Sequence, residues 1–79
     1  MNDFEILERI QKVYNHVTGR TDIVLKPDTS IVRSEEISSL AIVELIACLE
    51  DEFNIELRYS AIRSVKNVRG LMKIIRKNI

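Results

Sequence analysis

The chain has 79 residues, a formal net charge of zero and one cysteine. A chain this short buries about 60% of its unfolded surface, so we expect one small domain, residues 1–79, without room for both a core and a catalytic cleft. The single cysteine excludes an internal disulfide and favours a reducing compartment. No apolar run approaches the about 20 residues of a membrane span, and no secretory signal pattern opens the chain, so we expect a cytoplasmic protein. We also expect a monomer.

The composition also indicates the fold class. One proline, two glycines and few aromatic residues stand against many isoleucines, leucines and valines. This balance favours short helices joined by compact loops over a sheet, and we predict an all-α fold. His16 and Cys48 are too isolated to form a metal site, and we assign His16 no role.

The first predicted helix begins after Asn2, runs to about Val17 and stops near Gly19. Asn2 and Glu5 have the spacing of a capping box, and Gly19 is a typical helix terminator. Glu8 and Lys12, one turn apart, form a pair on an edge that we expect to be solvated. The apolar residues recur at helical spacing and predict a core helix: Phe4, Ile6, Leu7, Ile10, Val13, Tyr14 and Val17.

Residues 20–37 form a long link with no helical period. Pro27 and Asp28 are a turn signal within it. A link this long in so small a domain has to be held against the helices. We expect its apolar residues to do so: Ile23, Val24, Leu25, Ile31 and Val32.

The second predicted helix lies in the stretch from Ser38 to Leu57, SSLAIVELIACLEDEFNIEL. Its two opening hydroxyls can each cap a helix start. Apolar residues at spacings of four, three and four predict a buried seam: Ile42, Ile46, Leu49 and Phe53. The side opposite the seam carries Ala41, Glu44, Cys48 and Asp51, and a flank between them carries Leu40, Val43 and Ala47.

Charge is segregated along the chain although the total is zero. Residues 1–37 hold seven acids and five bases, residues 38–57 hold five acids and no base, and residues 58–79 hold seven bases and no acid. The second helix therefore presents one sign of charge, which implies a basic partner.

The end of the chain predicts two further helices. Residues 58–65 form a short connection of one or two helical turns, with Tyr59 and Ile62 on one side. Asn67 then caps a last helix, in which Gly70 marks close packing. The apolar side of this helix is Val68, Leu71, Met72, Ile75 and Ile79, and the basic side is Arg69, Lys73, Arg76 and Lys77. We predict that the basic side is solvated or contacts a dedicated acidic partner, without specific nucleic-acid binding.

Parts of the second helix resemble the corresponding helix of acyl carrier proteins. They are Ser39-Leu40, Val43-Glu44-Leu45 and the run from Leu49 to Glu56. The family pattern begins Asp-Ser-Leu and continues through Val-Glu-Leu to a Leu-Glu-Glu-Glu-Phe run. The resemblance implies a four-helix carrier-protein bundle with a long first loop and a short third helix. It covers the whole chain but is specific only from Ser39 to Glu56.

The resemblance implies that Ser39 receives a 4′-phosphopantetheine arm from coenzyme A through a phosphopantetheinyl transferase. Ser38 stands where the family usually has aspartate, and Glu35 and Glu36 replace its usual Leu-Gly pair. Elementary chemistry agrees with this placement, because free N–H groups and the dipole at a helix start favour an anion by about 0.3–1 kcal/mol.

The arm would hold an acyl or related group as a thioester and present it to acyl-activating or acyl-transferring enzymes with basic docking patches. Family members of fatty acid synthesis are usually strongly acidic, so this neutral chain indicates a specialised lipid or secondary-metabolite pathway, such as fatty acid or polyketide biosynthesis. We expect the docking residues to be Leu40, Val43, Glu44, Ala47, Glu50 and Asp51.

Other functions stay open from the sequence. A carrier-like helical interaction module whose serine is never modified is the main alternative, and the altered residues before Ser39 favour it. A nucleic-acid binder using the basic last helix is weakened by the neutral chain and the neighbouring acids. An enzyme is least favoured, because Ser39 has no triad signature and Cys48 has no activating partner in the sequence.

Overall fold

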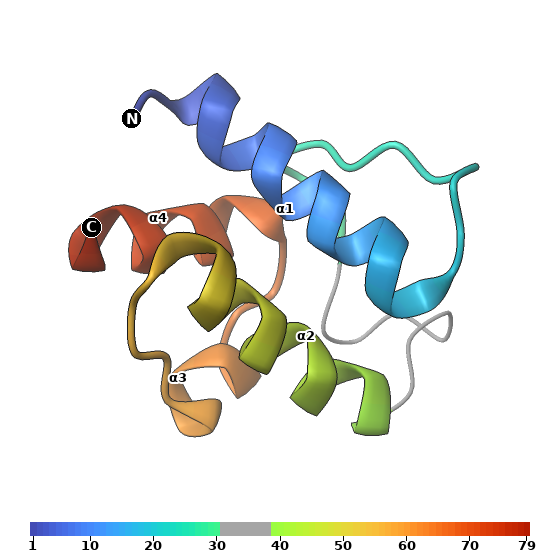
Figure 1. Cartoon of the computed structure of the whole chain (residues 1–79). Helices are drawn as coiled ribbons and strands as arrows, with labels where there is room; N and C mark the ends of the chain where they lie inside the picture. The colour runs from blue at the N-terminus through green and yellow to red at the C-terminus, as the bar shows by residue number, and fades with distance from the viewer. Residues whose placement is uncertain (31–38) are drawn as a thin grey trace.

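The computed structural model of the protein describes residues 1–30 and 39–79, without the side chain of Ser39. These residues form four helices, which confirms the all-α prediction with its short third helix (Figure 1): α1 (Asp3–Thr18), α2 (Ser39–Phe53), α3 (Tyr59–Arg63) and α4 (Val68–Asn78). The only pairing of extended backbone in the described part of the chain is an isolated bridge between Ser30 and Asn67. None of the four described helices has the length and apolar character that crossing a membrane requires.

α1 begins and ends where the sequence predicts. The Asn2 side chain accepts a hydrogen bond from the Glu5 N–H at 2.8 Å. Gly19 follows the last turn in the left-handed region, with a φ of 71°, and its N–H donates to the Asn15 carbonyl at 2.9 Å. Glycine adopts this conformation without steric cost, so it is well suited to end the helix. The residues that α1 buries are Ile6, Ile10, Val13 and Tyr14.

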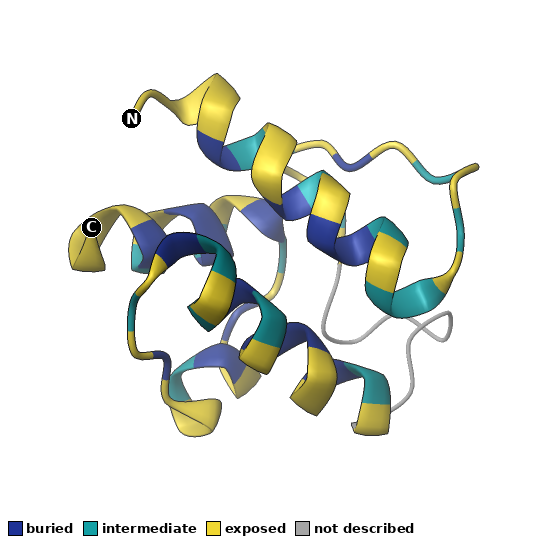
Figure 2. Cartoon of the chain, in the orientation of Figure 1, coloured by how far each residue is buried: buried dark blue, intermediate teal, exposed yellow. Residues whose placement is uncertain are grey.

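The prediction that Phe4 belongs to the core is wrong, because its side chain is 72% exposed. At 3.6 residues per turn, Phe4 lies outside the arc of α1 that Ile6, Ile10 and Val13 share. The first turn of α1 is correspondingly exposed in Figure 2. α1 therefore places a large aromatic side chain at the surface.

α2 packs beside α1 and runs in the opposite direction (Figure 1). The predicted seam is confirmed, since Ile42, Ile46, Leu49 and Phe53 are all buried. Leu45 is buried with them, although the predicted seam does not include it. The buried arc of α2 is thus one residue wider than the spacing of the seam suggests.

Glu52 of α2 pairs with two bases of α1. Its carboxylate oxygens lie 2.9 Å from the Lys12 Nζ and 3.6 Å from the Arg9 Nη1. Lys12 thus contacts the neighbouring helix, where the sequence predicted a pair with Glu8. Partly exposed pairs of this kind contribute about 1 kcal/mol or less each, but they favour the orientation of α2 in which Glu52 faces α1.

α2 ends at Phe53 rather than continuing toward Leu57. Asn54 is left-handed, with a φ of 54°, and the Ile55 N–H donates to the Glu50 carbonyl at 3.1 Å. A left-handed residue after the last turn, followed by a bond back to an unpaired carbonyl, is a common way to end a helix. Residues 54–57 therefore turn the chain toward α3.

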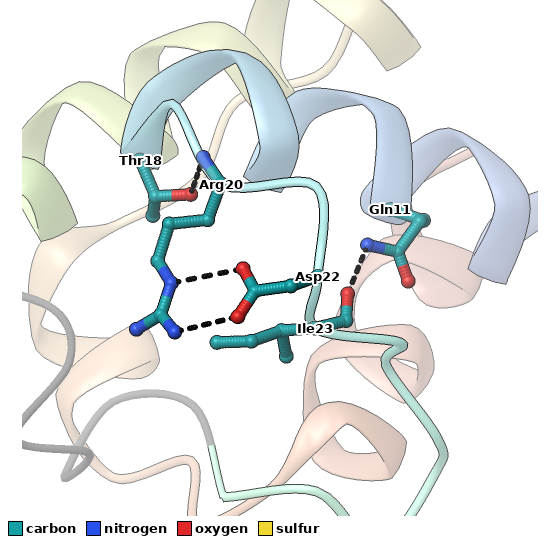
Figure 3. A network of polar contacts seen from close by, with 5 residues as sticks. All are labelled: Gln11, Thr18, Arg20, Asp22 and Ile23. Carbon is teal, nitrogen blue, oxygen red and sulfur yellow. Dashed lines mark hydrogen bonds and ion pairs between the residues drawn. The ribbon is translucent and has the colours of Figure 1, made fainter.

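The link that follows α1 is held by the side chain of Gln11. Its Nε2 donates to the Ile23 carbonyl at 2.9 Å (Figure 3), and its Oε1 accepts from the Leu25 N–H at 2.6 Å. Leu25 is buried and Ile23 half-buried, as predicted, but Val24 is exposed because neighbouring side chains of an extended segment point to opposite sides. Two further predicted anchors lie outside the described residues: Ile31 and Val32.

The start of the link is also ordered by hydrogen bonds. The Thr18 Oγ1 accepts from the Arg20 N–H at 3.2 Å, and the Arg20 guanidinium donates to both carboxylate oxygens of Asp22, at 3.2 and 2.8 Å (Figure 3). These bonds from Arg20 hold the pKa of Asp22 below its usual value. The chain therefore leaves α1 in a defined direction.

The far end of the described link caps α4. The turn at Pro27 and Asp28 is confirmed by a bond from the Thr29 N–H to the Lys26 carbonyl at 2.9 Å. The Thr29 carbonyl then accepts from the Val68 N–H at 2.9 Å, and the Pro27 carbonyl accepts from the Arg69 N–H at 2.7 Å. These N–H groups have no partner inside the helix, so the link satisfies them.

Asn67 caps α4 as predicted, because its Oδ1 accepts from the Gly70 N–H at 3.1 Å. A Cβ built on Gly70 would lie 3.2 Å from the Val65 Cγ1, so this glycine does mark close packing. The residues that α3 and α4 bury are Ile62, Val68, Leu71, Met72 and Ile75. Two predicted apolar positions are instead exposed: Tyr59, in the first turn of α3, and Ile79, beyond the last turn of α4.

We predict that Gln11→Leu lowers the free energy of unfolding by about 1–3 kcal/mol, because it leaves the Ile23 carbonyl and the Leu25 N–H without their partner. Glu8→Leu is the matched control, since Glu8 is exposed on the same helix, and it should change stability by about 0.5 kcal/mol or less. Urea unfolding measures both. Equal stability of the two variants would show that the link does not depend on Gln11.

Candidate functional site

The predicted attachment residue opens α2. Ser39 is the first residue of this helix, while Ser38 and the side chain of Ser39 lie outside the described residues. The first turn of α2 contains no acidic residue, so no carboxylate there opposes an anion at the helix start. Leu40, the next residue, is 78% exposed. The first turn of α2 is therefore electrostatically suited to a phosphodiester.

Five of the six predicted docking residues share one exposed face of α2: Leu40, Val43, Glu44, Ala47 and Asp51. The face begins beside Ser39 and follows the side of the helix turned away from the core. Val43 is 52% exposed, so two large apolar side chains, Leu40 and Val43, reach the surface beside the two acids. No ion pair engages Glu44 or Asp51 within the described part of the chain. The face thus combines apolar contact area with unpaired negative charge.

Glu50 differs from the other predicted docking residues. It is half-buried, and its Oε2 accepts a hydrogen bond from the Leu57 N–H at 3.1 Å. Its carboxylate therefore holds the turn that leads to α3 in addition to lying at the edge of the docking face. The sequence pattern did not indicate this role, although Asn54, a residue that tolerates left-handed backbone, was a signal that the helix ends nearby.

The four residues that we expected opposite the seam of α2 are not equally exposed. Glu44 and Asp51 are exposed as predicted, but Ala41 and Cys48 are half-buried and pack against the core. Cys48 and His16 border a cleft of about 410 Å³ between α1 and α2. No group of three possible metal ligands occurs among the described residues.

α3 borders a second hollow, of about 450 Å³, between the end of α2 and α4. Its lining includes the charged residues Glu50, Glu56 and Arg58 together with Ile74. Charged groups at a surface hollow keep it hydrated, so it is a poor environment for an apolar chain. This hollow therefore lacks the apolar character that a pocket for a carried acyl chain would need.

Comparison with known proteins identifies the family of this chain. A family model described as "Phosphopantetheine attachment site" matches residues 8–75, most of the chain. The chain is 30% identical over 74 residues to an acyl carrier protein of Buchnera aphidicola, covering 94% of this chain and 95% of that protein. The chain belongs to the acyl carrier protein family. It is 26% identical over 73 residues to an acyl carrier protein of Thermobifida fusca, covering 92% of each.

A solved structure supports the same family. The chain is similar to the solution structure of a holo acyl carrier protein from Geobacter metallireducens, with a TM-score of 0.79 and 26% identity, covering 91% of this chain and 83% of that one. The predicted carrier-protein fold is therefore confirmed.

Membership of the family establishes three coarse properties. Acyl carrier proteins are carriers and not enzymes, which confirms the prediction that this chain is not an enzyme. The prosthetic group is a covalently attached 4′-phosphopantetheine. The partner classes are a phosphopantetheinyl transferase and enzymes that handle acyl groups.

We predict that Glu50→Ala lowers the free energy of unfolding by about 1 kcal/mol, because the Leu57 N–H loses its acceptor. Glu44→Ala, which removes an exposed acid of the same helix, should change stability by about 0.5 kcal/mol or less. Thermal and urea unfolding of the two variants test the difference. If both variants are as stable as the parent chain, Glu50 has no structural role and belongs fully to the docking face.

Proposed function

We propose that this carrier holds an acyl or related group as a thioester on a 4′-phosphopantetheine arm attached to Ser39. The observation that carries the proposal is that α2 begins at Ser39, with Leu40 exposed beside it and no acid in the first turn. The thiol at the tip of the arm supplies the thioester chemistry, and the protein supplies the tether. Tethering raises the effective concentration of the bound group at each partner's active site.

The exposed face of α2 is proposed to dock basic patches on these partners. Its unpaired acids, Glu44 and Asp51, can steer a basic surface toward Ser39, and the apolar side chains of Leu40 and Val43 can contact it once it has arrived. The small side chain of Ala47 lets the partner's surface approach α2 closely. Glu50 contributes charge at the edge of this face while its carboxylate holds the turn.

The pathway and context belong to the same proposal. A neutral total charge with acids gathered in residues 38–57 supports a specialised lipid or secondary-metabolite pathway with dedicated partners. We propose that residues 1–79 act as one carrier domain, monomeric and in the cytoplasm, where the free Cys48 would stay reduced.

We predict that Ser39→Ala abolishes the mass increase of one phosphopantetheine when the protein is incubated with coenzyme A and a broad-specificity transferase. Ser38→Ala should retain it, because only Ser39 has the family spacing to Leu40 and Val43-Glu44-Leu45. Intact-protein mass spectrometry measures both. A modified Ser39→Ala with an unmodified Ser38→Ala would move the site by one residue, and no modification of the parent chain would favour the unmodified interaction module.

We predict that Glu44→Lys and Asp51→Lys together slow arm transfer at low salt, by about tenfold or more, because charge steering of association is lost. The rate difference should shrink as salt is added. Glu8→Lys and Glu56→Lys together are the control, since they reverse two exposed acids elsewhere and change the net charge equally. Equal rates for the two double variants would place the docking face elsewhere.

A further inference from the structure

A groove lies between the first turns of α1 and the outer side of α4. Its apolar lining comes from Phe4, Leu7, Pro27 and Met72, and its volume is about 460 Å³. The volume falls within the range of pockets that take a ligand or a large side chain. Phe4, which the sequence placed in the core, is the most exposed part of this lining. The groove is therefore an open apolar site outside the docking face of α2.

The rim of the groove is basic. Arg69, Lys73 and Arg76 line it together with one acid, Asp3, and that acid is paired with Arg76. Within the described residues, no carboxylate is paired with Arg69 or Lys73. These two bases lie four residues apart on α4, which places them one above the other at a separation of about 5–6 Å between their Cβ atoms.

We propose that this groove docks an acidic segment of a partner protein. A large apolar side chain of the segment enters between Phe4 and Met72, and two carboxylates one helical turn apart pair with Arg69 and Lys73. The apolar anchor provides most of the affinity in such an interface, while the charges at the rim set orientation and exclude basic partners.

Two observations favour an acidic protein segment over other occupants. The bases flank an apolar hollow, and a concave surface is filled by an inserted side chain better than by a flat lipid surface or a phosphate backbone. The charge on the α4 side of the groove is also one-sided, since residues 58–79 contain seven bases and no acid. Opposite charge is therefore the property that a partner of this face must have.

The first turns of α1, which border the groove, lie at the upper left in Figure 1, and the start of α2 lies at the lower right. A partner bound at α1 and α4 would leave Ser39 and the docking face of α2 free for a second protein. If the acidic segment belongs to an enzyme that handles acyl groups, its binding would raise the effective concentration of the carrier at that enzyme. This inference does not rest on the attachment of the arm, so it is testable on the unmodified chain.

The test is a titration of the unmodified, ¹⁵N-labelled chain with a short synthetic helical peptide that carries two glutamates one turn apart and a phenylalanine on the same face. The control peptide has lysines in place of the glutamates. We expect only the acidic peptide to shift the amide signals of the first turns of α1 and of residues 69–76, and we expect its affinity to fall with added salt.

Variants locate the site. Arg69→Glu and Lys73→Glu together should weaken the acidic peptide by about tenfold or more, and Phe4→Ala should weaken it by about threefold or more, without loss of helical circular dichroism. Arg63→Glu and Lys66→Glu together reverse two exposed bases outside the groove and should change affinity by about twofold or less.

Several results would overturn the proposal. These are absence of amide shifts in the groove at millimolar acidic peptide, equal shifts with the lysine peptide, or equal weakening by the control variant. Shifts that appear when the chain alone is concentrated would make a second copy the occupant. Groove shifts caused by phosphatidylglycerol vesicles or mixed DNA, but not by the acidic peptide, would assign the face to lipid or nucleic acid.

Discussion

The hydrogen bonds of the link between α1 and α2 are the constraint on which the other elements depend. At one end, Gln11 of α1 pairs with the backbone of Ile23 and Leu25. Further along the described part of the link, the carbonyls of Pro27 and Thr29 accept from the first N–H groups of α4. The link thus connects two helices that are distant in sequence, and each of these four bonds satisfies a backbone group that would otherwise lose its partner on burial.

This arrangement explains how so small a core can specify the placement of α4. α4 contributes Val68, Leu71 and Ile75 to the core. Apolar contacts of this kind keep the helix packed on the core, but they do not by themselves fix its rotation or its position along its axis. The backbone bonds from the link, together with the Asn67 cap, fix where the helix begins. The close approach of Gly70 to Val65 then limits its rotation. The basic residues of α4 are consequently held at the rim of the groove beside Phe4.

Packing also divides the acids of α2 into groups with different roles. Glu52 is used inside the fold by Lys12 and Arg9, and Glu50 is used by the turn toward α3. Glu44 and Asp51 are exposed and form no ion pair with the described residues. Residues 38–57 contain five acids, but only part of this charge is available to a partner. The negative face of α2 is therefore smaller than the number of acids in the sequence suggests. The separation of this face from the bases of α4 gives the neutral chain two surfaces of opposite charge.

Local patterns in the sequence were sufficient for the four helices, the caps of α1 and α4, and the seam of α2. Asn2, Gly19 and Asn67 act within one turn of their own helix, and the seam from Ile42 to Phe53 follows from helical period alone, so each could be predicted without knowledge of neighbours. The register of Ser39 with Val43-Glu44-Leu45 likewise identified the family from the sequence.

Contacts between segments distant in sequence decided the remaining features. Phe4 lies at the surface because the packed arc of α1 excludes it, Gln11 holds a link that no local signal assigns to it, and Glu50 serves a turn seven residues later. The extent of a buried arc depends on the neighbouring helix, and the partner of a polar side chain depends on which backbone groups the fold brings to it. Periodicity contains neither kind of information, and only the tertiary structure supplies it.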